Sequence, residues 1–144
     1  MSKIAIGSDH RGFELKEYLK KELKGYEFDD LGTNSNNSVD YPDIAKDVAM
    51  VVANNKYEKG ILICYTGIGM SIAANKVKGI RAALCHDETT AKMSREHNDA
   101  NVLCLGSGML EEEQAKAIAE VWLKTPFSNE ERHIDRNKKI KAME

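Results

Sequence analysis

The sequence predicts an α/β protein with a parallel sheet, and two patterns in it lead to this class. Strand and helix signals alternate from one end of the chain to the other, as they do in α/β folds. The run from Ile61 to Ile63 is also an unbroken stretch of branched apolar residues. Such a run suits a strand that is buried on both faces, which is the usual condition in a parallel sheet.

Length and composition limit the number of domains and the classes of function that the chain can have. The chain has 144 residues, enough for one domain with a hydrophobic core, and it contains no internal repeat, linker or low-complexity segment. We therefore expect a single domain over residues 1–144. The formal net charge of -2 predicts no general affinity for nucleic acid or for an anionic membrane. No apolar run is long enough to span a bilayer, and the N-terminus does not resemble a signal peptide.

The three cysteines, Cys64, Cys85 and Cys104, are widely spaced and odd in number. They match neither a zinc site nor a disulfide framework, so a reducing cytoplasm is the simplest compartment. No set of Cys, His and carboxylate residues has metal-ligand spacing within an expected helix or strand, and so no bound metal is expected.

The first half of the chain is expected to supply two strands and two helices. The first strand covers about 3–7, and a helix over 12–24 follows, because three leucines spaced four apart share one face there. A short strand is expected over 26–30. The stretch 32–40 is rich in Asn and Ser and indicates a loop. Pro42 suits the first turn of the next helix.

The second half continues the alternation after the strand at Ile61–Ile63. Further strands are expected over about 80–85 and 101–105. Helices are expected over about 87–96 and 111–124. The charged tail is expected to form a last helix over about 130–141.

The turn Cys64-Tyr-Thr-Gly-Ile-Gly69 joins the strand at Ile61–Ile63 to a helix rich in small residues. A strand, a glycine-containing turn and a helix in this order present backbone N–H groups at a helix N-terminus, where the helix dipole attracts anions. A helix N-terminus also stabilises a thiolate, so Cys64 is a candidate base or nucleophile. The alternative is a small buried cysteine without a chemical role. The glycine spacing matches neither the dinucleotide fingerprint nor the P-loop.

A second polar pair, Asp9-His10, follows the first expected strand. In doubly wound sheets, ligands bind beyond the carboxyl ends of the strands, where the strand order reverses. If the order begins 2-1-3, this pair faces the Cys64 turn across that crevice. His10 is then a candidate to bind an anion or to donate to a sugar oxygen, whereas Asp9 could be the cap of the following helix.

Two further pairs have both a functional and an ordinary interpretation. His97-Asn98 is either a helix-to-strand turn or an acid/base group with an amide donor beside it. Arg132 and Arg136 are four apart on the expected tail helix, so they share a face. That face is either a solvated basic patch or a phosphate clamp.

Three aromatic or imidazole residues complete the candidates. Tyr41 lies between Asp40 and Pro42, where it is either a packing residue at the helix start or a wall facing a ligand. His86 and His133 have no distinguishing context, and we expect both on the surface.

These motifs, taken in order, resemble the ribose-5-phosphate isomerase B family, which belongs with the LacA and LacB sugar-phosphate isomerases. The resemblance covers essentially the whole chain at matching spacing, and it is far more specific than any single motif. The matching segments are Gly7-Ser-Asp-His10, Val39-Asp-Tyr-Pro42, Gly60-Ile-Leu-Ile-Cys64, Thr66-Gly-Ile-Gly69, Ser71-Ile-Ala-Ala-Asn-Lys76, Gly79-Ile-Arg-Ala82, Ser94 to Val102 and Arg132-His-x-x-Arg136.

The resemblance implies a Rossmann-like three-layer α/β/α sandwich with five parallel strands in the order 2-1-3-5-4. It implies a homodimer or a dimer of dimers, with active sites at the subunit interface. The implied reaction is the aldose–ketose isomerisation of D-ribose 5-phosphate and D-ribulose 5-phosphate in the pentose phosphate pathway. That reaction would proceed through an enediolate without a metal or any other cofactor.

The resemblance also implies a role for each matching site residue. Cys64 would be the base that moves a proton between C1 and C2, Thr66 would contact O1 and O2, and His97 would open the furanose ring. The enediolate would lie in an anion hole made by Gly67, Ile68, Gly69, Met70, Ser71 and Asn98. The sugar would be contacted by Asp9 and Tyr41, and its phosphate would be bound by His10, Arg132 and Arg136.

Three positions depart from the family pattern. Tyr65 stands where the family usually has Gly, and Gly108 stands where members often carry Arg. Glu130-Glu131 replaces a common Gly-Gly before the tail motif. We expect these changes to affect the choice of substrate more than the type of reaction.

Other functions stay open on the sequence alone. Within the same family, the substrate could be a six-carbon sugar phosphate such as allose 6-phosphate or galactose 6-phosphate. A nucleotide- or flavin-binding module is a different class that the same fold hosts. The absence of a Gly-x-Gly-x-x-Gly motif after the first strand counts against that class. A redox role for Cys64 is weaker still, because no second cysteine lies near it in the sequence.

Overall fold

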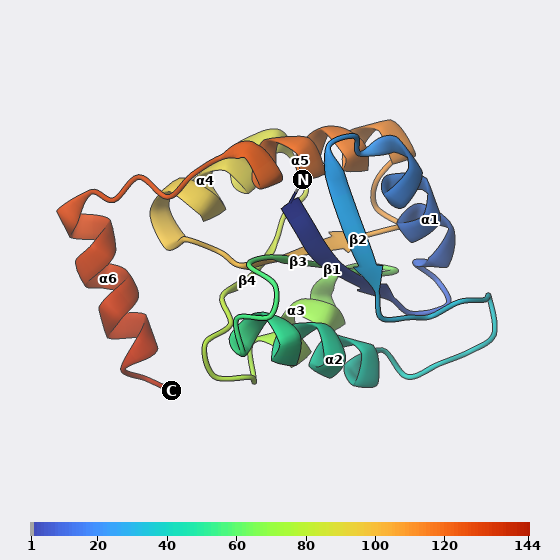
Figure 1. The fold of residues 1–144 in the computed structure, drawn as a ribbon, viewed down its shortest axis with the longest axis horizontal. Helices are drawn as coiled ribbons and strands as arrows, with labels where there is room; N and C mark the ends of the chain where they lie inside the picture. Colours follow the sequence, from blue (N-terminus) through green and yellow to red (C-terminus); the bar gives the residue numbers. More distant parts are fainter. Residues whose placement is uncertain (1) are drawn as a thin grey trace.

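The computed structural model describes residues 2–144 and confirms the α/β class. Its sheet has five parallel strands in the order β2-β1-β3-β5-β4, which is the order that the family resemblance implies. Helices cover both faces of the sheet and give a three-layer sandwich (Figure 1). The strands are β1 (Ser2–Ser8), β2 (Tyr26–Asp30), β3 (Gly60–Cys64), β4 (Ala82–Leu84) and β5 (Val102–Gly106).

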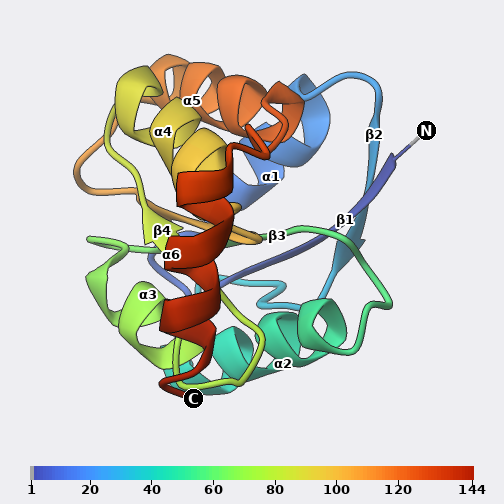
Figure 2. The same cartoon turned by 90° about the vertical axis from the view of Figure 1, so that its left-hand side faces the viewer.

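The helices divide between the two faces. The helices α1 (Phe13–Glu22), α4 (Glu88–Asn98) and α5 (Glu112–Lys124) pack on one face, and α2 (Tyr41–Ala53) and α3 (Ile68–Ala74) pack on the other. The tail helix α6 (Glu131–Lys141) stands at one end of the molecule, beyond α4 (Figure 1). Seen from that end, α6 runs from the layer of α4 toward the layer of α2 and α3 (Figure 2).

The central strands are buried as the unbroken apolar run predicts. Every residue of β3 and of β5 is buried, because helices cover both of their faces. The strand expected over 80–85 is shorter, since only Ala82–Leu84 pair with β5. The backbone N–H groups of Arg81 and Ala82 donate instead to side-chain oxygens of Asn101 and Asn75, at 2.7 and 2.8 Å. The side-chain amides of Asn101 and Asn75 therefore replace inter-strand hydrogen bonds at the start of β4, which is an edge strand.

The register places the ends of β1 and β3 side by side. Ser8 pairs with Ile63, and the Asp9 N–H donates to the Ile63 carbonyl at 3.2 Å. The loop after β2 holds the same corner, because the Ser8 N–H donates to the Gly32 carbonyl at 2.7 Å. These hydrogen bonds therefore hold the loops that follow β1 and β3 next to each other.

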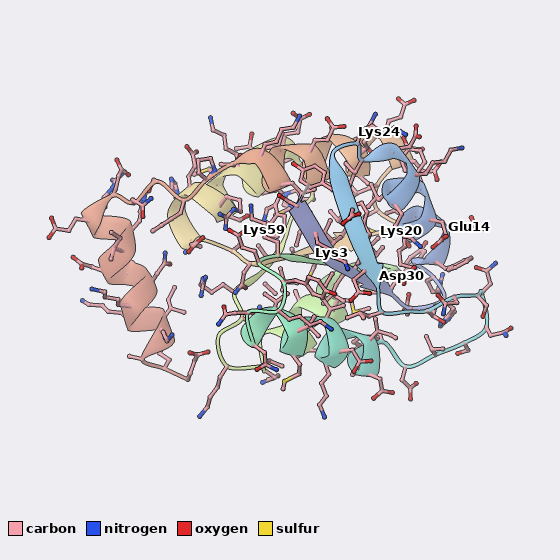
Figure 3. All side chains as sticks on the ribbon, in the orientation of Figure 1. Lys3, Glu14, Lys20, Lys24, Asp30 and Lys59 are labelled. Atoms are coloured by element: carbon pink, nitrogen blue, oxygen red, sulfur yellow. The ribbon has the colours of Figure 1, made fainter. Side chains whose placement is uncertain are left out.

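A buried ion pair attaches α1 to the end of β2, close to that corner. Lys16 has no exposed side-chain surface, and its Nζ lies 2.5 Å from Oδ2 of Asp30. Lys20 Nζ lies 2.7 Å from the same oxygen, and Figure 3 shows Lys20 of α1 close to Asp30 at the end of β2. Burial alone would raise the pKa of Asp30. Hydrogen bonds from Lys16, Lys20 and the Gly32 N–H outweigh it, and the pKa lies below its usual value.

We predict that Asp30→Asn destabilises the fold by about 3–5 kcal/mol, because it removes the nearest counter-charge of the buried Lys16 and leaves only the exposed Glu17 carboxylate, 3.4 Å away. Chemical denaturation at neutral pH measures this free energy of unfolding. The matched control is Lys20→Gln, which removes a partly exposed cation and leaves the Lys16–Asp30 pair intact. The control should lose about 1 kcal/mol or less.

The same pair predicts a pH dependence. Since the pKa of Asp30 is lower in the folded chain, its stabilisation is complete above the unfolded value of about 3.9. It is lost as the pH falls through the folded value, where the carboxyl becomes protonated. The stability difference between the wild type and Asp30→Asn should therefore shrink in acid. A difference that stays constant down to the acid limit of the native fold would contradict this assignment.

Candidate active site

Cys64 is the last residue of β3 and is 5% exposed. Its Sγ accepts a hydrogen bond from the Gly67 N–H at 3.2 Å. Gly67 is the N-cap of α3 and has φ +80, a left-handed conformation that favours glycine. A Cβ at Gly67 would also lie 2.5 Å from Leu84 Cδ1. The turn can therefore bring an amide donor onto the sulfur, where it stabilises negative charge.

The turn after Cys64 presents further donors. Thr66 Oγ1 accepts from the Ile68 N–H at 3.2 Å, and Ser71 Oγ donates to the Ile68 carbonyl at 2.8 Å. Across residues 2–144, the N–H groups of Gly69 and Met70 meet no backbone or side-chain acceptor. These two amides point out of the first turn of α3, where an anion can receive their hydrogen bonds.

Tyr41 forms a wall beside this turn. It is the first residue of α2, and its ring lies against the backbone of Gly69. A Cβ at Gly69 would be 2.6 Å from the ring carbons Cε1 and Cζ, so only glycine allows this approach. Tyr41 is partly exposed, which means that it both packs on α3 and faces the solvent side of the turn.

Asp9 and His10 occupy the neighbouring loop after β1. Asp9 is buried, and its Oδ1 accepts from the N–H groups of Arg11 and Gly12, each at 3.0 Å. One carboxylate oxygen therefore holds the turn that leads into α1. Asp9 is not the cap of that helix, because the N-cap of α1 is Gly12 and no side chain caps it. His10 Nδ1 accepts from the Val39 N–H at 3.2 Å. The neutral His10 ring then carries its proton on Nε2, which remains able to donate.

His97 and Asn98 lie in the last turn of α4 and contact the tail helix. The rings of His97 and His133 stack with their centroids 4.4 Å apart. Asn137 Nδ2 donates to the His97 carbonyl at 3.1 Å, and Asn98 Nδ2 donates to Asn137 Oδ1 at 3.4 Å. These contacts fix α6 against the end of α4.

The prediction that His133 lies on the surface is wrong, because the residue is only 4% exposed. Its Nδ1 lies 2.9 Å from Ser128 Oγ and 3.3 Å from Glu130 Oε2. Burial lowers the pKa of His133, and the nearby His97 and Arg132 lower it further. A neutral His133 therefore stacks on His97. No pattern in the sequence predicts this contact, because it depends on where α6 docks.

Arg132 and Arg136 are exposed on α6. Arg132 Nη2 lies 3.2 Å from Glu130 Oε2, one of the two glutamates that depart from the family pattern. Neither arginine is enclosed by its own chain. His86 is exposed, as expected.

The structure brings the predicted site residues together in two separate groups. Cys64 ends β3 opposite Gly106, at the carboxyl edge of the sheet, and Gly60 and Val102 mark the amino edge. His97 and Asn98 precede β5 and so lie at the amino edge. Four residue steps of strand separate the two edges by about 13 Å. One copy of the chain therefore does not place His97 beside Cys64.

Residues 2–144 contain no cluster of three or more His, Cys, Asp or Glu residues able to hold a metal ion. None of the helices in that range is both long and apolar enough to cross a membrane.

The carboxyl edge of this parallel sheet carries a thiol, a turn with backbone N–H donors and an imidazole, an arrangement suited to binding an anionic small molecule in an α/β protein. Comparison with known proteins identifies the family. The model of the Ribose/Galactose Isomerase family matches residues 4–140. The chain belongs to this family.

Individual relatives agree with the family match. The chain is 47% identical to the ribose-5-phosphate isomerase B of Escherichia coli (strain K12), covering 100% of this chain and 97% of that one. It superposes on the type B ribose 5-phosphate isomerase of Trypanosoma brucei with a TM-score of 0.95 at 49% identity, covering 100% and 99%. It superposes on a structure of the Mycoplasma genitalium ribose-5-phosphate isomerase B with bound ribulose-5-phosphate with a TM-score of 0.93 at 43% identity. That match covers 98% of this chain and 95% of the other.

Proposed function

We propose that this chain interconverts D-ribose 5-phosphate and D-ribulose 5-phosphate through an enediolate intermediate. The observation that carries the proposal is the Cys64 thiol, which receives an amide hydrogen bond beside a turn with two unused N–H donors. The E. coli relative is a ribose-5-phosphate isomerase B, and the M. genitalium structure holds ribulose-5-phosphate. We propose one isomerase domain over residues 1–144, acting in the cytoplasm without a cofactor.

In this proposal Cys64 moves the proton. Its thiolate takes a proton from C1 of the ketose or from C2 of the aldose and returns it to the other carbon. Negative charge then develops on the enediolate oxygens. The Gly69 and Met70 N–H groups and the Thr66 hydroxyl lie where preorganised donors would stabilise that charge. The Ser71 hydroxyl would join them by exchanging its hydrogen bond to the Ile68 carbonyl for one to the substrate. Tyr41, whose ring packs on Gly69, and Asp9, whose N–H donates to the Ile63 carbonyl next to Cys64, would contact the sugar.

The separation of the two residue groups supports a homodimeric site. A second copy would bring its own His97, Asn98, Arg132 and Arg136 to the Cys64 edge of the first. The surface near the Cys64 turn is suited to burial, since Ile68, Ile72 and Met109 are 51%, 59% and 57% exposed. Apolar side chains gathered on one surface favour association with a partner. A two-fold axis would then complete two identical sites, whether the assembly is a dimer or a dimer of dimers.

The phosphate end of the proposed site combines both copies. His10 Nε2 is free to donate because Nδ1 accepts the Val39 N–H. Arg132 and Arg136 of the second copy would add two guanidinium groups, which bind phosphate through paired, charge-assisted hydrogen bonds. Their exposure in a single chain leaves them accessible for that role.

An isomerase assay on a panel of pentose and hexose phosphates tests the proposed substrate. Ribose 5-phosphate and ribulose 5-phosphate should give the highest kcat/KM. A higher value for allose 6-phosphate or galactose 6-phosphate would keep the reaction type and replace the substrate. Activity on none of these sugars would contradict the proposed function.

We predict that Cys64→Ala lowers kcat by about 10²–10⁴-fold while sugar phosphate still binds, because a general base contributes that much to a proton transfer. Steady-state kinetics and calorimetric binding measure the two effects. The matched control is Cys85→Ala, at the residue after β4, where burial raises the pKa of the thiol. The kcat of that control should stay close to the wild-type value. A Cys64→Ala enzyme that keeps more than about a tenth of kcat would show that another group is the base.

We predict that His97→Asn impairs the conversion of ribose 5-phosphate far more than proton exchange on ribulose 5-phosphate. The aldose must open its furanose ring before C2 becomes acidic, and an imidazole can move the ring proton near neutral pH. Ribulose 5-phosphate cannot close a furanose ring and needs no opening. Deuterium wash-in at C1 of ribulose 5-phosphate is compared with the aldose-to-ketose rate. Equal losses in both assays would assign His97 to another step.

A further inference from the structure

Tyr65 and Gly108, two of the positions that depart from the family pattern, are in contact. A Cβ at Gly108 would lie 2.3 Å from Cε1 and Cζ of the Tyr65 ring. The two backbones are also joined, since the Gly108 N–H donates to the Tyr65 carbonyl at 2.8 Å. With Tyr65 in this place, position 108 has no room for a side chain. The two departures are therefore one structural feature beside Cys64.

Arg11 belongs to the same feature. Its guanidinium carbon lies 4.0 Å from the centroid of the Tyr65 ring, which is a close cation–π contact. Its carbonyl accepts from Ser107 Oγ at 2.8 Å, and the same hydroxyl lies 3.3 Å from the Cys64 carbonyl. The backbone of Arg11 is thus fixed beside the end of β3, and the aromatic ring holds the side chain.

In the part of the chain that the structure describes, Arg11 has no carboxylate partner. Three other arginines, Arg81, Arg95 and Arg132, each lie within 4.0 Å of a carboxylate. Within residues 2–144, no carboxylate oxygen lies that close to the Arg11 guanidinium. Arg11 directly follows His10, whose Nε2 is also free to donate. Two neighbouring donors with no protein acceptor, one permanently charged, are suited to an anion.

We propose that Arg11, held on the ring of Tyr65, binds the phosphate group of the substrate together with His10. The inference rests on the proposed function for the identity of the ligand. Arginine presents a planar fork of donors that matches two phosphate oxygens. The Tyr65 ring restricts the side chain before the ligand arrives, which reduces the entropy lost on binding. Gly108 contributes by leaving the ring room to lie there.

The test is Arg11→Gln, with KM and kcat for ribulose 5-phosphate and the calorimetric affinity for inorganic phosphate. Loss of one charge-assisted contact should raise KM and weaken phosphate binding by about 10–150-fold while kcat changes little. The control Lys21→Gln removes one exposed positive charge from α1 and should change neither value. Unchanged KM and unchanged phosphate affinity in Arg11→Gln would overturn the proposal.

Two variants separate the role of the ring from general damage to the loop. Tyr65→Phe keeps the aromatic face and should bind phosphate as the wild type does, whereas Tyr65→Leu should weaken binding in the same direction as Arg11→Gln. Activity on unphosphorylated ribulose should be unaffected by Arg11→Gln. An equal loss on that sugar would show that Arg11 only supports the loop, and would overturn the proposal.

The phosphate measurement also separates this inference from the proposed function. Suppose that the wild type isomerises no sugar phosphate, but that Arg11→Gln binds inorganic phosphate more weakly than the wild type does. The proposed function is then wrong, and the proposed anion site stands. If the wild type isomerises ribose 5-phosphate and Arg11→Gln matches it in KM and in phosphate affinity, the function stands and the role of Arg11 is wrong.

Discussion

The hydrogen-bonded register of β3 and β5 fixes where the chemistry can lie. Because the strands are parallel, Cys64 and Gly106 share the carboxyl edge, while the segment from His97 leads into the amino edge. The strands alone separate these edges by about 13 Å. The contacts of α6 with His97 hold the second group in place, so no local rearrangement of a loop would unite the two. A site that uses both groups needs two copies of the chain.

Close approach between backbones shapes the Cys64 half of the site. A Cβ at Gly106 would lie 2.6 Å from the Thr66 carbonyl, and a Cβ at Gly67 would meet Leu84. Glycine at these positions lets the turn after β3 lie directly against β5. The same closeness brings the Gly67 N–H onto Cys64 Sγ. Packing and chemistry at this turn therefore depend on the same residues.

The sequence predicted those parts of the protein that local pattern controls. The run Ile61–Ile63, followed by glycines and small residues, was enough to predict the strand, the turn and the helix that place Cys64. The strand order came from the family resemblance, because periodicity does not show which strands are neighbours. The burial of His133 was missed, since α6 is polar around most of its surface and only its docking on α4 covers that residue.

Other contacts were missed for the same physical reason. A lysine on a helix is normally expected to be exposed. Lys16 is buried because it pairs with Asp30, which lies fourteen residues away in the sequence, on β2. Tyr65 and Gly108 were recognised separately as departures, but only the fold shows that the ring of one occupies the space above the other. Contacts between distant segments depend on the assembled sheet, which no local pattern encodes.

The proposed division of the site between two copies is tested most directly by mixing two variants that each lack one of the proposed catalytic residues. Chains carrying Cys64→Ala are co-refolded with chains carrying His97→Asn, and mixed assemblies are confirmed with two affinity tags. Each mixed dimer would contain one site with both residues intact. Random pairing then predicts recovery of about a quarter of wild-type activity. Mixed dimers that form but recover no activity would contradict a site shared between two chains.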